Sequence, residues 1–205
     1  MLAELTIKEF LEKIASNSPA PGGGSVAALS AALAASLTEM VAKLTIGKKG
    51  YETVEDEMKA VAQDAMKLKH KLVQAIDKDS DAYKDVIAAI KLPGSTEAEK
   101  RHREKAIQNG LKQATLIPMA IAEDAARVME LAGKAVANGN KNTITDGAVG
   151  VMMAKTAILS ALYNAKINLS SIKDNTFIEK ISRQVKGLEA KILGREKELL
   201  SNVNL

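Results

Sequence analysis

The chain contains no cysteine and no tryptophan, and its other aromatic residues are few. Its 205 residues include three tyrosines and two phenylalanines, so aromatic residues make up only 2% of the sequence. The absence of cysteine excludes disulfide bonds, thiolate zinc sites and cysteine nucleophiles. Because large rings are scarce, we expect a core of alanine, leucine, isoleucine, valine and methionine, which suits helices packed closely on helices.

A β-strand pattern and a long uninterrupted apolar run are also missing. No segment alternates polar and apolar residues with a period of two. The most apolar stretch, residues 26–46, is interrupted by Thr38, Glu39 and Lys43, so we interpret it as a buried helix and not as a membrane span. The polar first ten residues do not have the form of a signal peptide. We therefore expect a cytoplasmic protein without a membrane partner.

Charge of one sign is not concentrated in any segment. The formal net charge is +4, and lysines are interleaved with aspartates and glutamates, as is typical of solvated helix faces. Without a basic stripe or stacking aromatic residues, no nucleic-acid partner is expected, whereas the small excess of lysine favours an anionic small molecule. The two histidines, His70 and His102, lack metal-ligand spacing, so we expect both on the surface and no metal site.

Helix signals recur along the whole chain. Capping-box patterns occur at Thr6, Thr96 and Thr176, each followed three residues later by glutamate. We predict helices over about residues 6–16, 25–45, 53–90, 96–136 with a kink at Pro118, 145–173 and 176–200. These helices predict an all-α fold, an antiparallel bundle of long helices in a single domain spanning residues 1–205. The alanine-rich second helix has small residues on nearly every side, which indicates that it is surrounded, in part by a second subunit.

The most irregular stretch contains Pro21, Gly22, Gly23, Gly24 and Ser25. Three glycines at a helix start leave backbone N–H groups free to bind an anion or a carbonyl oxygen. The pattern is neither a Walker A loop nor a dinucleotide fingerprint, because the required lysine and the preceding strand are missing. Taken alone, the turn is also compatible with a flexible segment that leads to an N-cap at Ser25.

Asp79 is the titratable residue that most suggests chemistry. Aspartate is unfavourable in mid-helix, and a rotation of 100° per residue places Asp79 about 60° from the centre of an apolar stripe, with Asp81 at about 140°. Tyr83 follows Asp79 by four residues and shares its face. A carboxylate at the edge of a core needs a partner or a function, and burial would raise its pKa toward that of a useful base. A structural ion pair is the alternative.

Further polar candidates lie in loops and in one apolar helix. Asn140 belongs to a Gly/Asn loop that suits recognition of an amide-rich ring, and Asp146 follows at a helix start, where it also compensates the helix dipole. Asn164 and Asn168 either line a polar pocket or bridge helices. Lys48, in a basic loop, is either solvated or captures a carboxylate-bearing ligand.

Motifs in a fixed order run through nearly the whole chain. They are Pro19-Ala-Pro-Gly-Gly-Gly-Ser25, Thr45-Ile-Gly-Lys-Lys-Gly-Tyr51, Asp79-Ser-Asp-Ala-Tyr83, Ile117-Pro118, the loop from Gly139 to Asp146, and the segment from Asn164 to Leu169. Each motif is weak alone, but the ordered set is specific. Through it the chain resembles the formiminotetrahydrofolate cyclodeaminase / methenyltetrahydrofolate cyclohydrolase family, with Thr145 where serine is common.

The resemblance implies an all-helical homodimer that needs no metal and no cofactor beyond its tetrahydrofolate substrate. Asp79 matches the aspartate with an acid/base role in that family. The substrate-binding residues expected from the resemblance and from the polar pattern are Pro21, Gly22, Gly23, Gly24, Ser25, Lys48, Tyr83, Asn140, Asp146 and Asn168. Lys48 is expected either to keep Asp79 ionised or to bind the glutamate tail of the folate.

The implied chemistry takes place at the carbon that bridges N5 and N10 of tetrahydrofolate. A cyclohydrolase adds water to 5,10-methenyltetrahydrofolate and yields 10-formyltetrahydrofolate, whereas a cyclodeaminase closes 5-formiminotetrahydrofolate and releases ammonia. Because no formiminotransferase sequence is fused to this chain, we expect the cyclohydrolase, with the cyclodeaminase as the alternative. A non-catalytic folate-binding scaffold is the third hypothesis.

Overall fold

The structure is a computed structural model that describes residues 1–201 and 203, so residues 202, 204 and 205 of the predicted domain lie outside it. The described residues contain helices and no strand, which confirms the predicted all-α class. In chain order the elements are η1 (Leu2–Glu4), α1 (Ile7–Ile14), α2 (Gly23–Lys43), η2 (Glu52–Val54), α3 (Glu55–Ile90), α4 (Glu97–Asn138), η3 (Lys141–Thr143), α5 (Ile144–Leu169), α6 (Asn175–Ile192) and α7 (Arg195–Leu199).

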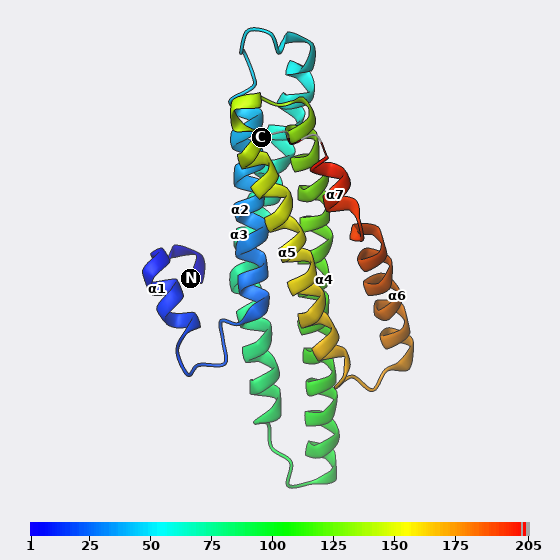
Figure 1. Cartoon of the computed structure of the whole chain (residues 1–205). Coiled ribbons are helices and arrows are strands. Elements are labelled where there is room, and N and C mark those ends of the chain that lie inside the picture. Colours follow the sequence, from blue (N-terminus) through cyan, green and yellow to red (C-terminus); the bar gives the residue numbers. More distant parts are fainter. Residues whose placement is uncertain (202, 204–205) are drawn as a thin grey trace.

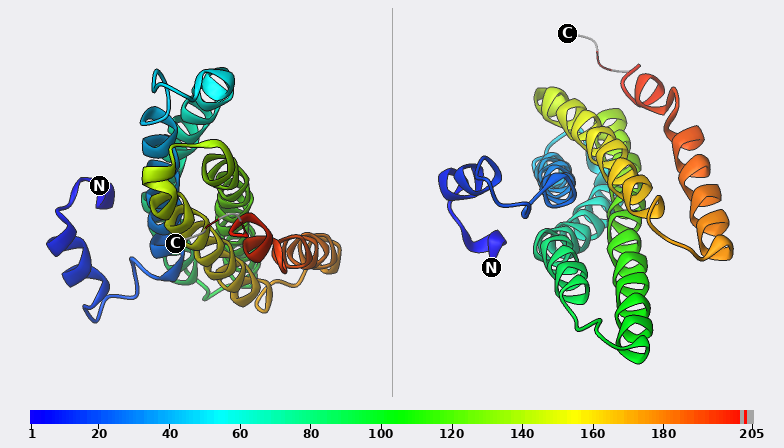
Figure 2. Two further views of the ribbon diagram at one scale, coloured as in Figure 1. Left: turned by 45° about the horizontal axis from the view of Figure 1, so that its top comes forward. Right: turned by 90° about the horizontal axis from the view of Figure 1, so that it is seen from below.

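Four long helices, α2 to α5, form the body of the molecule (Figure 1). Each packs on its neighbour in the chain, and α5 also packs along α2, so the four close into a bundle. The short helices α6 and α7 lie along the outside, on the side of α4 and α5 (Figure 2). Helix α1 lies on the opposite side, beyond α2 and α3.

The bundle core is built largely from alanine, as the scarcity of aromatic residues predicts. On α2, Ala28, Ala31, Ala34 and Ala35 are fully buried, and α5 contributes further fully buried alanines. Small side chains allow neighbouring helices to pack with little space between their backbones. Larger apolar side chains such as Met129 fill the remaining volume. The hydrophobic effect therefore holds the bundle together through many small contributions, of about 0.8 kcal/mol per buried methylene-sized group.

Two of the predicted helix starts are confirmed in detail. The hydroxyl groups of Thr6 and Thr96 each accept a hydrogen bond of 3.2 Å from the backbone N–H three residues later. The carboxylates of Glu9 and Glu99 accept hydrogen bonds from the backbone N–H groups of Thr6 and Thr96 in return. Each reciprocal pair satisfies two N–H groups that a helix start leaves without partners.

Three other predicted boundaries are wrong. Helix α2 begins after Gly22 and α5 after Thr143, so each starts earlier than predicted. Helix α6 begins after Asp174, whose carboxylate accepts a hydrogen bond from the N–H of Phe177 and so takes the capping role predicted for Thr176. The predicted last helix is also divided, because Gly194 adopts φ 78° and ends one helical segment before α7 begins.

The N-terminal segment is fixed to the bundle by a carboxylate of α3. The backbone N–H groups of Leu2 and Ala3 donate hydrogen bonds of 2.6 and 3.3 Å to the two carboxylate oxygens of Asp77. Leu2 is buried at this contact, whereas Ile7 and Leu11 on the following helix α1 remain exposed. Asp77 therefore has a structural role.

Candidate active site

The start of α2 lies directly against Asp79 of α3. A Cβ atom built on Gly24 would lie 2.0 Å from Oδ1 of Asp79, a distance that no side chain tolerates. Glycine is therefore required at position 24 because the carboxyl group occupies the place of its side chain. A Cβ on Gly23 would lie 3.1 Å from Nδ2 of Asn164 on α5. The glycine turn thus lets the backbone of α2 fit between a carboxyl group and an amide.

Ser25 connects the glycine turn to the candidate catalytic carboxyl group. Its Oγ lies 2.9 Å from the carbonyl oxygen of Ile76 and 3.1 Å from Oδ2 of Asp79. The single hydroxyl hydrogen serves one of these acceptors at a time. Because Ser25 is fully buried, this interaction replaces the N-cap role that the sequence also allowed.

Burial and hydrogen bonding act on Asp79 in opposite directions. Desolvation raises the pKa of the Asp79 carboxyl above its usual value of 3.8, while hydrogen bonds from the side chain and backbone N–H of Ser25 oppose the rise only in part. Among the described residues, no lysine or arginine forms an ion pair with Asp79. The alternative prediction of a structural ion pair is therefore wrong for the chain as described. A half-buried carboxyl group with a raised pKa can accept a proton and return it.

The helical geometry around Asp79 agrees with the prediction from periodicity. Asp79 is half-buried, whereas Asp81 is exposed and pairs with Lys84 at 2.8 Å. Tyr83, one turn after Asp79, is 38% exposed. Its ring lies at the surface, one helical turn from Asp79.

The two asparagines of α5 have different surroundings, and both alternatives hold. Asn168 bridges helices, because its Nδ2 donates a hydrogen bond of 2.7 Å to the carbonyl oxygen of Ala114 on α4. Asn164 donates to Ser160 of its own helix at 2.9 Å and keeps its amide beside Gly23. Asn164 therefore belongs to the surroundings of Asp79, whereas Asn168 fixes α5 on α4. The spacing of four residues shows that the two share a face, but it does not assign these separate partners.

The remaining candidates gather at the other end of α2. Nζ of Lys48 donates a hydrogen bond of 2.5 Å to Oδ1 of Asn140 and lies 5.6 Å from the centre of the Tyr51 ring. Asn140 is fixed by hydrogen bonds from its backbone N–H to Thr45 and from its Nδ2 to the carbonyl oxygen of Leu44. Asp146 lies close by in sequence, half-buried in the first turn of α5.

A single chain does not bring all the candidates together. Helix α2 has 21 residues, so at 1.5 Å per residue about 30 Å separates the glycine turn from the loop that carries Lys48. Gly24, Ser25, Asp79 and Asn164 form one group, which we call the Asp79 group. Lys48, Tyr51 and Asn140 form a second, which we call the Lys48 group. The expectation that Lys48 keeps Asp79 ionised is therefore wrong within one chain.

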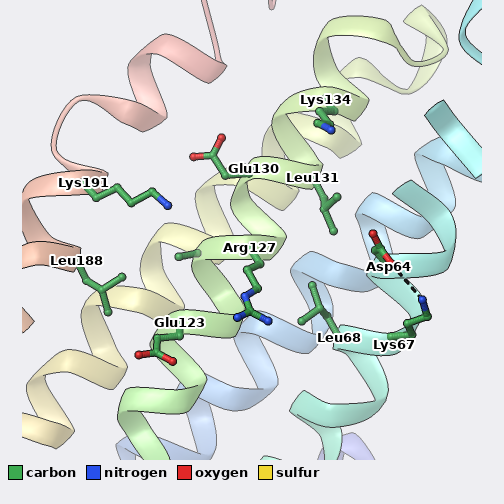
Figure 3. A pocket seen from close by; sticks show the side chains of 11 residues that line it. Asp64, Lys67, Leu68, Glu123, Arg127, Glu130, Leu131, Lys134, Leu188 and Lys191 are labelled. Atoms are coloured by element: carbon green, nitrogen blue, oxygen red, sulfur yellow. Dashed lines mark hydrogen bonds and ion pairs between the residues drawn. The ribbon is translucent and has the colours of Figure 1, made fainter. Parts of the chain in front are cut away.

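A groove of about 680 Å³ opens elsewhere, between α3, α4 and α6 (Figure 3). Its walls carry four basic and three acidic side chains around Leu68, Leu131 and Leu188, and Lys67 pairs with Asp64 at 3.3 Å. None of the predicted site residues lines this groove. Its mixed charges favour neither an anion nor a cation. In the part of the chain that the structure describes, no group of three metal-binding side chains occurs.

Comparison with known proteins agrees with these features. A family profile described as formiminotransferase-cyclodeaminase matches residues 6–187. A methenyltetrahydrofolate cyclohydrolase from Methylorubrum extorquens is 38% identical over 93% of this chain and 91% of its own length. A formimidoyltransferase-cyclodeaminase from Rattus norvegicus is 32% identical over 91% of this chain, which spans only 35% of that longer protein.

A solved structure extends the similarity to three dimensions. The crystal structure of a formiminotetrahydrofolate cyclodeaminase from Thermotoga maritima superposes with a TM-score of 0.88 at 31% identity, over 98% of this chain and 97% of the other. Sequence and structure lead to the same assignment, and the chain belongs to the formiminotransferase-cyclodeaminase family.

Proposed function

We propose that this protein is a methenyltetrahydrofolate cyclohydrolase in which Asp79 is the catalytic acid and base. The observation that carries the proposal is the half-buried Asp79 carboxyl group, whose pKa is raised by burial and which lies against the start of α2. The full-length similarity to the cyclohydrolase from Methylorubrum extorquens supports the choice of reaction. The reaction opens 5,10-methenyltetrahydrofolate to 10-formyltetrahydrofolate.

The chemistry needs one group that accepts a proton and then returns it. Water adds to the cationic methenyl carbon while Asp79 accepts one of its protons, which gives a tetrahedral carbon bonded to N5 and N10. The bond from this carbon to N5 then breaks: N5 keeps the electron pair and receives the proton held by Asp79, while the hydroxyl group on the carbon loses its proton to solvent as the C=O bond of the formyl group forms on N10. One proton is released in the net reaction. The negative charge of Asp79 also favours binding of the methenyl cation.

The surroundings of Asp79 support substrate binding as well as proton transfer. Backbone N–H groups at the start of α2, from Gly23 and Gly24, have no partner within the helix and can donate to a polar edge of the pterin ring. The exposed Tyr83 ring and the Asn164 amide are near the carboxyl group. The site requires no cofactor beyond the folate. The protein acts in the cytoplasm as a homodimer, and Lys48, Asn140 and Asp146 belong to the folate-binding residues.

A cyclodeaminase is the second candidate, because the similar Thermotoga maritima structure carries that name. In that reaction N10 attacks the formimino carbon on N5, and ammonia leaves after a proton has been transferred to it. The same Asp79 carboxyl group serves both reactions, since both pass through a tetrahedral carbon between two nitrogens. Asp79 and its surroundings therefore support a folate enzyme more firmly than they support one of the two reactions.

Purified protein supplied with each folate in turn separates the candidates. Faster loss of 5,10-methenyltetrahydrofolate than in buffer, without ammonia release from 5-formiminotetrahydrofolate, supports the cyclohydrolase. If ammonia is released from 5-formiminotetrahydrofolate faster than 5,10-methenyltetrahydrofolate is hydrolysed, the protein is a cyclodeaminase and the proposed cyclohydrolase activity is wrong. Binding of both folates without turnover of either leaves the non-catalytic scaffold and overturns the proposed activity.

A further inference from the structure

Pro118 leaves a carbonyl group of α4 without its helical donor. In an α-helix the N–H of each residue donates a hydrogen bond to the carbonyl oxygen four residues earlier. Pro118 lies inside α4 and has no N–H, so the carbonyl oxygen of Ala114 loses this partner. Pro118 is buried and Ala114 is half-buried. A carbonyl group in such surroundings needs a donor from another part of the protein.

The side chain of Asn168 supplies that donor. Its Nδ2 donates a hydrogen bond of 2.7 Å to the carbonyl oxygen of Ala114, across the contact between α5 and α4. A carbonyl oxygen only accepts hydrogen bonds, so an acidic or apolar side chain at position 168 could not replace the amide. Pro118 and Asn168 therefore act as a pair, in which the proline leaves an acceptor free and the asparagine binds it.

Two further polar contacts hold the loop that follows α5 against α4. The side-chain amide of Gln108 donates to the carbonyl oxygen of Ser171 at 3.2 Å and accepts from the backbone N–H of Lys173 at 2.8 Å. These contacts lie after the end of the helix, whereas Asn168 makes its contact from the last turn of α5 itself. Asn168 therefore fixes the rotation of the last turns of α5 about the helix axis.

Asn164 lies one helical turn before Asn168, on the same face of α5. Its Nδ2 donates to the carbonyl oxygen of Ser160 at 2.9 Å, and a Cβ built on Gly23 would lie 3.1 Å from Nδ2 and 3.4 Å from Oδ1. Among the described residues, none donates a hydrogen bond to Oδ1 of Asn164, and no fully buried side-chain oxygen or nitrogen lacks a partner. This half-buried amide oxygen is therefore open to a ligand.

The Asn164 amide and the Asp79 carboxyl group flank consecutive residues of α2. The amide lies against the side-chain position of Gly23, and the carboxyl group occupies the side-chain position of Gly24. Consecutive residues of a helix point about 100° apart around its axis. An acceptor from α5 and a proton acceptor from α3 thus meet the first turn of α2 from different directions, so the place of α5 decides where the amide lies relative to Asp79.

We propose that Asn164 binds the substrate through Oδ1 and that Asn168, held by the carbonyl group that Pro118 leaves free, keeps Asn164 in position. This inference rests on the proposed folate activity. The pterin ring of tetrahydrofolate carries N–H and NH₂ groups, which are the donors that an amide oxygen accepts. Turning the NH₂ group of Asn164 toward the ligand would break the hydrogen bond to Ser160. The contact therefore selects an N–H group of the ring over a carbonyl oxygen. Asn168 contacts α4 and is a positioning residue.

The pairing of Pro118 with Asn168 can be tested without a substrate. Asn168→Ala removes the donor to Ala114 while Pro118 is present, whereas in Pro118→Ala the N–H of the new alanine restores the helical hydrogen bond. We expect Asn168→Ala to lower the equilibrium constant for folding about tenfold beside Pro118 and only about twofold in the Pro118→Ala background. Urea denaturation of the four proteins measures this difference. If Asn168→Ala folds only in the Pro118→Ala background, the result is the same, whereas equal losses in the two backgrounds would overturn the pairing.

Steady-state kinetics tests the substrate contact. Asn164→Leu removes Oδ1 with little change of volume, and we expect it to raise KM roughly fivefold to tenfold, as the loss of one hydrogen bond to the substrate does. The value of kcat should change less, because Asp79 and its proton transfer are untouched. An unchanged KM would overturn the contact between Asn164 and the substrate.

The two asparagines should not act independently. If Asn168 acts through Asn164, Asn168→Ala raises KM in the wild-type background but adds little to the KM of Asn164→Leu. The variant with both Pro118→Ala and Asn168→Ala should recover stability, yet its KM should stay raised, because the contact that holds α5 on α4 is still missing. Additive effects of the two asparagine substitutions, or a KM that recovers together with stability, would show that Asn168 has only a structural role.

Ser170→Ala is the matched control, because the Ser170 hydroxyl also donates to a backbone carbonyl group near the end of α5, but its acceptor, Ile167, belongs to the same helix. This variant should keep the stability and the KM of the wild type. Losses as large as those of Asn168→Ala would contradict the assigned role of the contact with α4.

The two kinds of measurement separate this inference from the proposed function. Urea denaturation requires no folate, so it can contradict the pairing of Pro118 with Asn168 even if the protein is active. If the protein binds both folates without turnover, calorimetric dissociation constants replace KM in the same comparison of variants. If it binds neither folate, the substrate contact of Asn164 is overturned together with the proposed function. If it turns over a folate and Asn164→Leu leaves KM unchanged, the contact alone is overturned.

Discussion

The carboxyl group of Asp79 occupies the space that a side chain at Gly24 would need. A Cβ at position 24 would lie 2.0 Å from Oδ1, 2.5 Å from Cγ and 2.6 Å from Oδ2 of Asp79. This contact joins the most irregular motif of the sequence to its most unusual carboxylate. It also explains why the glycine turn precedes a buried helix, where glycine is otherwise unfavourable.

Gly24→Ala is therefore expected to abolish activity and to destabilise the fold. The new methyl group must displace the Asp79 carboxyl group or the first turn of α2, and overpacking of this kind costs about 1–3 kcal/mol. Gly187→Ala is the matched control, because a Cβ there meets nothing within 4 Å on helix α6. That variant should keep full activity and gain up to about 1 kcal/mol. Urea denaturation with rate measurements checks both, and similar losses in the two variants would contradict the assigned contact.

Asp79→Asn should lower the rate by about 10²–10⁴-fold, because the proton acceptor is lost. The same variant should be more stable than the wild type near neutral pH. Burial raises the pKa of Asp79, so the folded state holds this proton more tightly than the unfolded state does. As the pH rises from 3.8 through the raised pKa, the free energy of unfolding of the wild type therefore falls relative to that of Asp79→Asn. Above the raised pKa, the difference between the two proteins is constant. Thermal unfolding at several pH values measures this, and a difference that shrinks with rising pH would be inconsistent with it.

The pH dependence of kcat/KM should follow the ionisation of Asp79. Only the carboxylate accepts a proton from water, so the rate falls at acidic pH with a midpoint above the usual aspartate value of 3.8. Stopped-flow measurements between pH 4 and pH 8 would locate this midpoint. A midpoint at or below 3.8 would mean that burial does not raise the pKa of the group whose ionisation controls the rate.

Ser25→Ala should move the same midpoint to higher pH. The Ser25 hydroxyl stabilises the ionised carboxylate through the 3.1 Å hydrogen bond to Oδ2, and its removal leaves desolvation less opposed. The maximum rate should change less than the midpoint, because the backbone N–H of Ser25 still donates to Asp79. Ser36→Ala is a suitable control, since its hydroxyl donates to Ala32 within α2. An unchanged pH profile in Ser25→Ala would show that this hydroxyl does not tune Asp79.

Local sequence signals predicted much of the fold and the placement of Asp79. The capping boxes at Thr6 and Thr96 were right, whereas at Thr176 the same three-residue spacing was overridden by Asp174, which caps α6 two residues earlier. The helical period placed Asp79 at the core edge and Asp81 in solvent. The proximity of Asn164 to Gly23 could not be predicted, because it depends on how far α5 is shifted along α2. No local sequence pattern predicts the position of α5 along α2.

The grouping of the site residues was harder to predict. The family resemblance assigned Lys48 and Asp79 to one folate site, whereas α2 keeps them at opposite ends of a single chain. The predicted length of the alanine-rich helix already indicated this separation. A straight helix of that length keeps the glycine turn before it far from Lys48 after it.

The central claim is that Asp79 carries out folate chemistry at the bridging carbon. The most direct measurement follows the ultraviolet absorbance of 5,10-methenyltetrahydrofolate with wild-type protein, with Asp79→Asn and with buffer alone. The account predicts that the wild type accelerates the loss of absorbance and that Asp79→Asn matches buffer while retaining its helical fold. An Asp79→Asn variant that turns over the methenyl folate as fast as the wild type would contradict it.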